Sequence, residues 1–361
     1  KKSSLSFNLN SIPLEFNLST KQIKEEVRTL ISSESQIKLS HLFSYHDYSN
    51  FFNGSSKFNI QFILPGYIRG QDISNFLINI DSQLKGTEIQ LPKPFRKDSE
   101  SEIALKFNLS ERAEKNNLVF SYGDILRGRL ILRDSKFEGY VIAGPEKQSI
   151  SVVPDQIKLV GTFDELDLNS LSQLKIDSNS ISGNSFFIEN LNIGQAKLSS
   201  ALILDTSINM APTSKGPLFS LKNKDFSGTV LLKENREIDL KLDFLKFSPD
   251  QTQEDSFFLS IFNSINSSVL FSVEDFLLGS KSYGNWSFNA SRSSNSLVLE
   301  NINGEYGRWG VAKNKDNQQS KLVISKNSFG WDSKLKTRIY SGSPEKAFSQ
   351  IGLDVDFLIG E

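Results

Sequence analysis

Apolar and polar residues alternate over much of this chain. In residues 58–64 and 103–109, for example, Phe, Ile and Leu fill nearly every second position, and polar residues such as Lys106 and Asn108 stand between them. A period of two is typical of β-strands that bury one face and leave the other in water. The pattern therefore predicts an all-β fold made of short strands from one end of the chain to the other.

Two sets of residues are expected on the apolar faces of these strands. In the first half they are Phe58, Ile60, Phe62, Phe76, Ile78, Ile80, Ile103, Leu105 and Phe107, which should point into one shared interior while Asn75, Asn79, Lys106 and Asn108 face outward. In the second half they are Leu240, Leu242, Phe244, Trp286, Phe288, Leu297, Leu299, Leu335, Ile339, Val355 and Phe357.

Turn residues separate the predicted strands. Clusters of Gly, Asn and Ser occur at residues 53–56 and 291–296, and short strands joined by such turns favour antiparallel meanders over crossover helices. Pro92 and Pro94 are expected in a turn or at a sheet edge, because proline has no amide hydrogen to donate to a central strand. The expected sheet is long, antiparallel, twisted and curled.

Few helices are expected, and the clearest lies near residues 20–32. Ser19 or Thr20 could cap it, and apolar residues including Val27 and Ile31 would share one face. The best candidate for an internal joint is the stretch from residue 145 to 154. We therefore expect a first β segment over residues 1–154 and a second over residues 155–361, continuous with the first; one sheet and two domains are equally compatible with the pattern.

The apolar faces must be shielded from water, since a fully buried Leu or Phe stabilises a fold by about 1.5 to 3 kcal/mol. A β-sandwich or a closed barrel would achieve this, and so would a curled sheet left open along one side and filled by an apolar ligand. The 28 phenylalanines and the scarcity of helices favour the open groove. The chain begins at Lys1 and holds no apolar run of the roughly 20 residues that span a bilayer, so we expect a piece of a longer protein.

Composition and motifs argue against an enzyme and against nucleic-acid binding. The chain has no cysteine, two histidines, and 41 basic against 42 acidic residues, so neither a thiolate metal site nor a basic phosphate-binding surface is indicated. His41 and His46 are five residues apart, which does not match the zinc-protease spacing. Carboxylates such as Glu237 and Asp239 fit solvated strand faces. Nucleophile-elbow and Walker motifs are absent from the sequence, and no catalytic residue, cofactor or metal is expected.

One segment resembles a known family. Residues 81–97 read DSQLKGTEIQLPKPFRK, and this is similar to a motif of the YhdP branch of the AsmA-like proteins. The matching residues are Ser82, Leu84, Gly86, Leu91, Pro92, Pro94 and Lys97. Residues 117–132, 157–174, 226–247 and 275–307 resemble later strands of the same branch, so the likeness covers most of the chain after residue 58.

The resemblance implies a β-groove that conducts phospholipid. In that family the groove is anchored in the inner membrane by an N-terminal helix and crosses the periplasm of a Gram-negative cell, carrying phospholipid towards the outer membrane. The present chain would be a middle or C-terminal portion without the anchor, its apolar residues would line the groove and contact acyl chains, and its protein partners are not indicated. The alternative is a surface or secreted β-sandwich that binds protein or sugar.

Overall fold

The structure is a computed structural model. It describes residues 2–9, 12–23, 26–42, 47–65, 75–112, 115–133, 136–146, 150–168, 185–198, 201–235, 237–247, 268–293, 296–306, 309–312, 321–325, 328–332 and 336–339. Two compact units are present: Lys1–Lys197 with Ile203–Asn209, and Leu198–Leu202 with Met210–Glu361. Each unit is described separately below.

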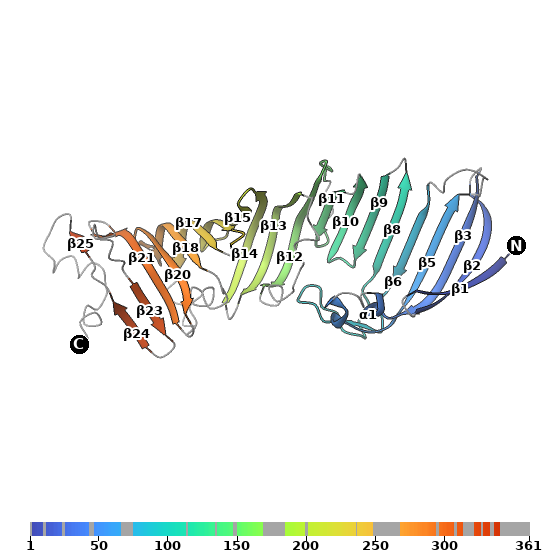
Figure 1. The fold of residues 1–361 in the computed structure, drawn as a ribbon, viewed down its shortest axis with the longest axis horizontal. Helices are drawn as coiled ribbons and strands as arrows, with labels where there is room; N and C mark the ends of the chain where they lie inside the picture. Colours follow the sequence, from blue (N-terminus) through green and yellow to red (C-terminus); the bar gives the residue numbers. More distant parts are fainter. Residues whose placement is uncertain are drawn as a thin grey trace. The chain divides into compact units, whose positions relative to one another are not determined.

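The first unit is built almost wholly of strands, drawn side by side in Figure 1. They are β1 (Lys2–Leu9), β2 (Ile12–Ile23), β3 (Glu26–Ile37), β4 (Phe52–Gly54), β5 (Ser56–Pro65), β6 (Leu77–Ser82), β7 (Thr87–Ile89), β8 (Leu105–Arg112), β9 (Lys115–Tyr122), β10 (Leu126–Arg133), β11 (Lys136–Ala143), β12 (Gln156–Asp167) and β13 (Ser185–Leu198). β14 (Ala201–Thr213) contributes residues to both units. The all-β prediction is confirmed.

The main sheet of the first unit is mixed and is not closed into a barrel. Strands β1, β2, β3, β5, β6, β8, β9, β10 and β11 pair in this order, each antiparallel to the next. β12 then pairs parallel to β11, and β13 parallel to β12. The expected antiparallel pairing is thus present from β1 to β11, and the parallel pair of β11 and β12 follows because the connection after β11 is long enough to return the chain to the starting end of that strand.

The joint expected at residues 154 and 155 falls inside the first unit. It lies just before β12, and the parallel ladder between β11 and β12 joins the chain on its two sides, for example through Val141 and Leu159. The division between the two units comes instead after Lys197.

The helix predicted near residues 20–32 is wrong. This stretch forms the end of β2 and most of β3, which pair antiparallel with Thr20 opposite Thr29 and Leu18 opposite Ile31. The helix was predicted because apolar residues of this stretch recur at helical spacing. The β-branched residues of the segment favour strands, and pairing with β5 on the far side of β3 fixes the extended form.

Helices are few, as expected. In the described part of the chain they are α1 (Leu39–Leu42) and the 3-10 helix η1 (Asp47–Phe51). Neither is long and apolar enough to cross a membrane.

The second unit is also a mixed β structure. Its strands are β15 (Gly216–Lys222), β16 (Phe226–Leu232), β17 (Ile238–Phe247), β18 (Val269–Leu278), β19 (Lys281–Ser282), β20 (Asn285–Ser293), β21 (Ser296–Tyr306), β22 (Trp309–Ala312), β23 (Lys321–Ser325), β24 (Ser328–Asp332) and β25 (Lys336–Ile339). Strands β15, β16, β17, β18, β20, β21 and β23 pair in this order, and only the pair of β17 and β18 is parallel among these described strands.

Candidate functional site

Three rows of cross-strand neighbours define an apolar face on the main sheet of the first unit. The first row is Leu18, Ile31, Phe62, Ile78, Leu109, Leu118, Leu130, Gly139, Ile157 and Phe186. The second row is Ser33, Ile60, Ile80, Phe107, Phe120, Gly128, Val141, Leu159 and Ile188, and the third is Ser35, Phe58, Ser82, Leu105, Tyr122, Leu126, Ala143, Gly161 and Leu191. Directly opposed residues share a face, so each row crosses the sheet.

The opposite face of the same strands is mixed, with a largely polar central row. This row runs through Ser32, Gln61, Asn79, Asn108, Val119 and Arg129. Side-chain hydrogen bonds link neighbours on this face: Asn59 Nδ2 donates to Asp81 Oδ2 over 2.9 Å, and Arg129 Nε donates to Asn117 Oδ1 over 2.7 Å. Apolar residues also lie on this face towards the strand ends, among them Ile63, Leu77 and the buried Ile142 and Val160. The first unit therefore has one face with three apolar rows and one face whose central row is polar.

The structure brings most of the first predicted set together on the apolar face. Phe58, Ile60 and Phe62 of β5, Ile78 and Ile80 of β6, and Leu105 and Phe107 of β8 occupy adjacent positions in the three rows. Phe76 comes just before β6, where its carbonyl oxygen accepts a hydrogen bond from Glu111 N. Ile103 precedes β8 in a separate segment, its amide bonded to Gln83 O.

The second unit has an apolar face of the same kind. Leu240 of β17, Phe271 of β18 and Phe288 of β20 form one row, in which the rings of Phe271 and Phe288 stack with centroids 4.5 Å apart. Leu242, Val273 and Trp286 form the next row. Leu299 lies opposite Ala290, and both are buried.

Phe244 does not belong to this face, contrary to the prediction. A bulge in β17 places Asp243 as an extra residue, so that Leu242 lies opposite Gly228 while Phe244 lies opposite Ser227 and Asp275. Leu245, which is buried opposite Phe226, takes the apolar position in its place. One extra residue moves every following side chain to the other face.

Several predicted residues cannot be placed. Leu335, Val355 and Phe357 lie outside the described residues, and the side chains of Leu297 in β21 and Ile339 in β25 do so as well.

Large side chains lie over glycines of the neighbouring strand on both apolar faces. A Cβ atom at Gly128 would come within 2.6 Å of the Phe120 ring, and one at Gly304 within 2.5 Å of the Trp286 ring. Gly128 is opposite Phe120 and Gly304 is opposite Trp286 in their ladders. The glycines thus give the rings room to lie flat on the sheet.

One end of the first unit's apolar face is covered by parts of two connecting segments, residues 38–42 with 47–55 and residues 83–104, which we call the cap. Figure 1 shows α1 and the neighbouring loops of the cap at the ends of β5, β6 and β8. Leu39, Leu84 and Ile89 of the cap are buried in one cluster with Phe16 and Phe58 of the sheet. Within the cap, β4 and β7 form a small separate sheet.

The residues of the 81–97 motif build this cap. Ser82 Oγ donates to Lys57 O over 2.8 Å and accepts from Leu84 N over 3.0 Å, and Leu84 is 1% exposed. Gly86 has a φ of 87°, in the left-handed region that favours glycine. Pro92 and Pro94 lie in a turn, which confirms that prediction.

Lys97 is the polar centre of the cap. Its side chain is buried, and Nζ donates to Thr87 O and to Asp98 O, each over 2.8 Å. Burial lowers the pKa of Lys97. Beside it, the hydroxyls of Ser56 and Thr87 are hydrogen-bonded at 2.5 Å, both fully buried.

The cap also reaches strands far along the chain. Phe95 packs edge-to-face on Phe163 of β12 with ring centroids 5.8 Å apart, and its carbonyl oxygen accepts a 3.0 Å hydrogen bond from Tyr122 Oη. Lys93 Nζ pairs with Glu165 at 3.0 Å. Burial raises the pKa of Tyr122 to about 12, so the hydroxyl keeps its proton.

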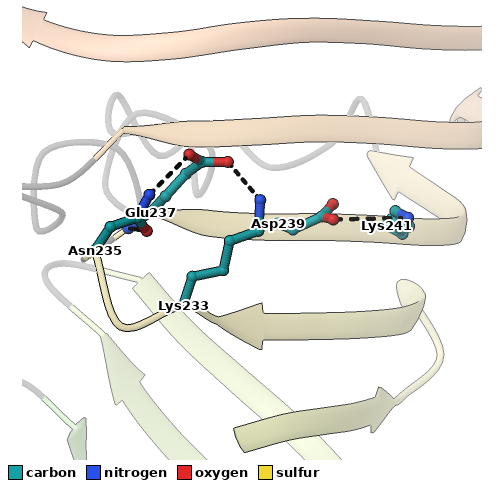
Figure 2. A network of polar contacts seen from close by, with 5 residues as sticks. All are labelled: Lys233, Asn235, Glu237, Asp239 and Lys241. Carbon is teal, nitrogen blue, oxygen red and sulfur yellow. Dashed lines mark hydrogen bonds and ion pairs between the residues drawn. The ribbon is translucent and has the colours of Figure 1, made fainter. Parts of the chain in front are cut away.

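A polar network holds the turn between β16 and β17 in the second unit, as Figure 2 shows. Lys233 Nζ donates to Glu237 Oε1 over 2.6 Å, Asn235 Oδ1 accepts from Glu237 N over 3.1 Å, and Lys241 lies 3.6 Å from Asp239. The hydrogen bond from Lys233 lowers the pKa of Glu237. The carboxylates of Glu237 and Asp239 thus each have a lysine partner, which fits their interpretation as solvated strand residues.

Metal-binding side chains do not gather in the described residues. No cluster of three or more His, Asp or Glu side chains able to hold a metal occurs there. His41 lies in α1 with its amide bonded to Lys38 O, and His46 lies outside the described residues.

The sequence alone missed several members of the apolar rows. Leu118, Phe120 and Leu130 extend the face over β9 and β10. Val119 on the polar face interrupts the alternation in β9, and Gly128 leaves an inner position without a side chain in β10. The Tyr-Gly turn at residues 122 and 123, which joins β9 and β10, is the sequence feature that could have indicated these two strands.

Comparison with known proteins identifies one family. The family profile described as YhdP protein matches residues 1–344. No curated protein sequence matches the chain.

Proposed function

We propose, because the chain belongs to the YhdP family, that its apolar faces hold phospholipid acyl chains on their way across the bacterial envelope. YhdP is a lipid-transport family of AsmA-like envelope proteins and is not known for enzymes. We further propose that this chain is part of a protein that bridges the periplasm of a Gram-negative bacterium. The parent protein would be anchored in the inner membrane and would conduct phospholipid towards the outer membrane.

The apolar rows of the first unit carry the proposal. They continue from strand to strand across β5 to β12, whereas the central row of the opposite face is largely polar. Phe62, Ile78, Leu109 and Leu118 of the first row are only half-buried. An apolar surface of this kind is stabilised when hydrocarbon replaces water against it.

The alternative, an adhesion module built as a β-sandwich, needs a second sheet packed face to face on the first. The described residues of the first unit form the main sheet and one small sheet, the two-stranded pair of β4 and β7 in the cap. This arrangement favours a groove over a sandwich.

A matched pair of substitutions tests the proposal. Phe107→Asp places a charge on the apolar face, and an unpaired charge buried against hydrocarbon costs several kcal/mol. Asn108→Asp places the same charge one residue away on the polar face. Mass spectrometry of organic extracts should show phospholipid with the parent chain and with Asn108→Asp, and at least tenfold less with folded Phe107→Asp.

Two outcomes count against the proposal. One is equal phospholipid in folded Phe107→Asp and in the parent chain. The other is a requirement for His41: loss of lipid delivery to the outer membrane in a folded, abundant His41→Ala protein would point to an enzyme or a metal site.

A further inference from the structure

Burial changes in one direction along the strands of the first unit. Third-row residues are buried or packed against the cap, as with Phe58 (3% exposed), Ala143 (0%) and Tyr122. First-row residues such as Leu109 and Leu118 are half-buried. Beyond the first row, the apolar face ends at the strand ends near Leu64, Phe76, Glu111 and Asn116, which we call the open edge.

The cap is held by hydrogen bonds within itself and to the end of the sheet. Within the cap, Gly86 N donates to Ser99 O over 2.8 Å and Ile103 N to Gln83 O over 2.9 Å; at the turn after β9, Gly123 N donates to Ala104 O over 2.7 Å. These bonds, together with those from the buried Lys97 side chain, give backbone N–H and C=O groups of the cap their hydrogen-bond partners. Hydrocarbon that lies on the face therefore meets protein side chains at the third row.

The strip left between the cap and the open edge has a definite depth. On β8 it runs from Phe107 to Glu111, and on β9 from Phe120 to Asn116, which is four residue steps along each strand. At about 3.3 Å per residue this is about 13 Å. One leaflet of a bilayer has a hydrocarbon depth of about 15 Å, half of the full core. The strip is thus about as deep as one layer of acyl chains.

Polar groups return on the apolar face at the open edge. Glu111 and Asn116 lie opposite one another there, directly beyond Leu109 and Leu118. Asn116 Oδ1 is buried and has no hydrogen-bond partner among the described residues. Glu111 and Asn116 thus place a carboxylate and an amide at this edge, whereas apolar side chains of the cap cover the third row.

We propose that the cap is a stop that orients phospholipid on the first unit: acyl chains enter from the open edge, their methyl ends lie against the second row beside the cap, and the headgroup stays at the open edge near Glu111 and Asn116. This inference rests on the proposed function and adds to it the direction of the lipid across the strands.

Two phenylalanines of β5 provide the first test in the full chain. Phe62 lies in the first row and Phe58 in the third, so p-azidophenylalanine at each position changes the same residue type on the same strand. Phospholipid should be crosslinked at Phe62 at least several-fold more than at Phe58, where the crosslink should join the cap. Gln61 on the polar face is the background control.

Equal lipid crosslinking at Phe58 and Phe62 would overturn the orienting role of the cap while leaving the proposed function intact. Crosslinking at background level in both positions would instead overturn the proposed function.

Spin-labelled phospholipid tests the orientation in the unmodified chain. A nitroxide at the end of an acyl chain should broaden the methyl resonances of Ile80 in the second row more than those of Leu132, which lies opposite Asn116 and Phe137 at the open edge. A nitroxide on the headgroup should do the reverse. Equal broadening at both residues, or the opposite order, would overturn the proposal.

Discussion

Tyr122 donates its hydroxyl hydrogen to the carbonyl oxygen of Phe95 across 3.0 Å, which ties the end of β9 to the cap. Tyr122 is also opposite Leu105 and Leu126 in the third row. A single side chain therefore forms part of the apolar face through its ring and fastens the cap through its hydroxyl.

Tyr122→Phe should make the stability of the chain less sensitive to high pH. Because the pKa of Tyr122 is raised from 10.0 to about 12, the folded state holds this proton more tightly than the unfolded state does. Its contribution is complete below pH 10 and is lost as the pH rises from 10 to 12. This pH-dependent loss should be absent from Tyr122→Phe in urea unfolding at each pH. Parallel pH profiles for the two proteins would contradict this.

Lys97→Met should destabilise the first unit strongly. Methionine fills similar space but leaves Thr87 O and Asp98 O without their donor, at a cost of about 1 to 3 kcal/mol for each unsatisfied buried group. The matched control is Lys106→Met, which removes an exposed lysine from the polar face and should change the free energy of unfolding by less than about 0.5 kcal/mol. Equal effects in thermal unfolding would show that the buried lysine has no special role.

Gly128→Ala should destabilise the sheet by about 1 to 3 kcal/mol through overpacking. The new Cβ would lie 2.6 Å from the Phe120 ring and 2.8 Å from Tyr140 O. If the ring is the main obstacle, Gly128→Ala should cost less in a Phe120→Ala background than in the parent, and a double-mutant cycle of unfolding free energies measures the difference. Purely additive effects would place the obstacle in the backbone of β11 instead.

Lys233→Met should raise the pKa of Glu237 towards that of an ordinary carboxyl group. The hydrogen bond from Lys233 lowers this pKa in the folded state, so the stabilisation from the pair is present above the unfolded pKa and disappears as the pH falls through the folded pKa. NMR titration of the Glu237 side chain measures the change. Lys241→Met, which removes the partner of Asp239 on β17, should leave the Glu237 titration unchanged.

Much of the fold could be predicted from alternation alone. One face carries the predicted apolar residues of β5, β6 and β8, from Phe58 to Phe62, from Ile78 to Ile80 and from Leu105 to Phe107. Side chains alternate between the two faces along each strand, and the register places apolar residues of neighbouring strands opposite one another. Phe244 escaped prediction because the bulge at Asp243 arises from pairing between strands, which a single-strand pattern does not contain. The false helix at 20–32 has the same origin: its partners on β2 and β5, Asn17 and Phe62 among them, decide its state.

The alternation of apolar and polar residues did not predict the cap. The Pro92 turn and the sequence from Ser82 to Lys97 signalled a defined structure, but only long-range contacts show that Phe95 reaches Phe163 and that Lys93 reaches Glu165. These partners are far apart in sequence, and no local propensity encodes their meeting. The lipid-facing role of the rows remains a proposal.

The apolar rows have a kinetic consequence. On the first row, Phe62, Ile78, Leu109 and Leu118 offer no hydrogen-bond donor or acceptor from their side chains, and the backbone groups between them are engaged in the sheet ladder. A hydrocarbon chain that shifts from one strand to the next exchanges one dispersion contact for another of similar strength. The free-energy profile for sideways sliding over these strands is therefore nearly level, and thermal diffusion suffices for each step.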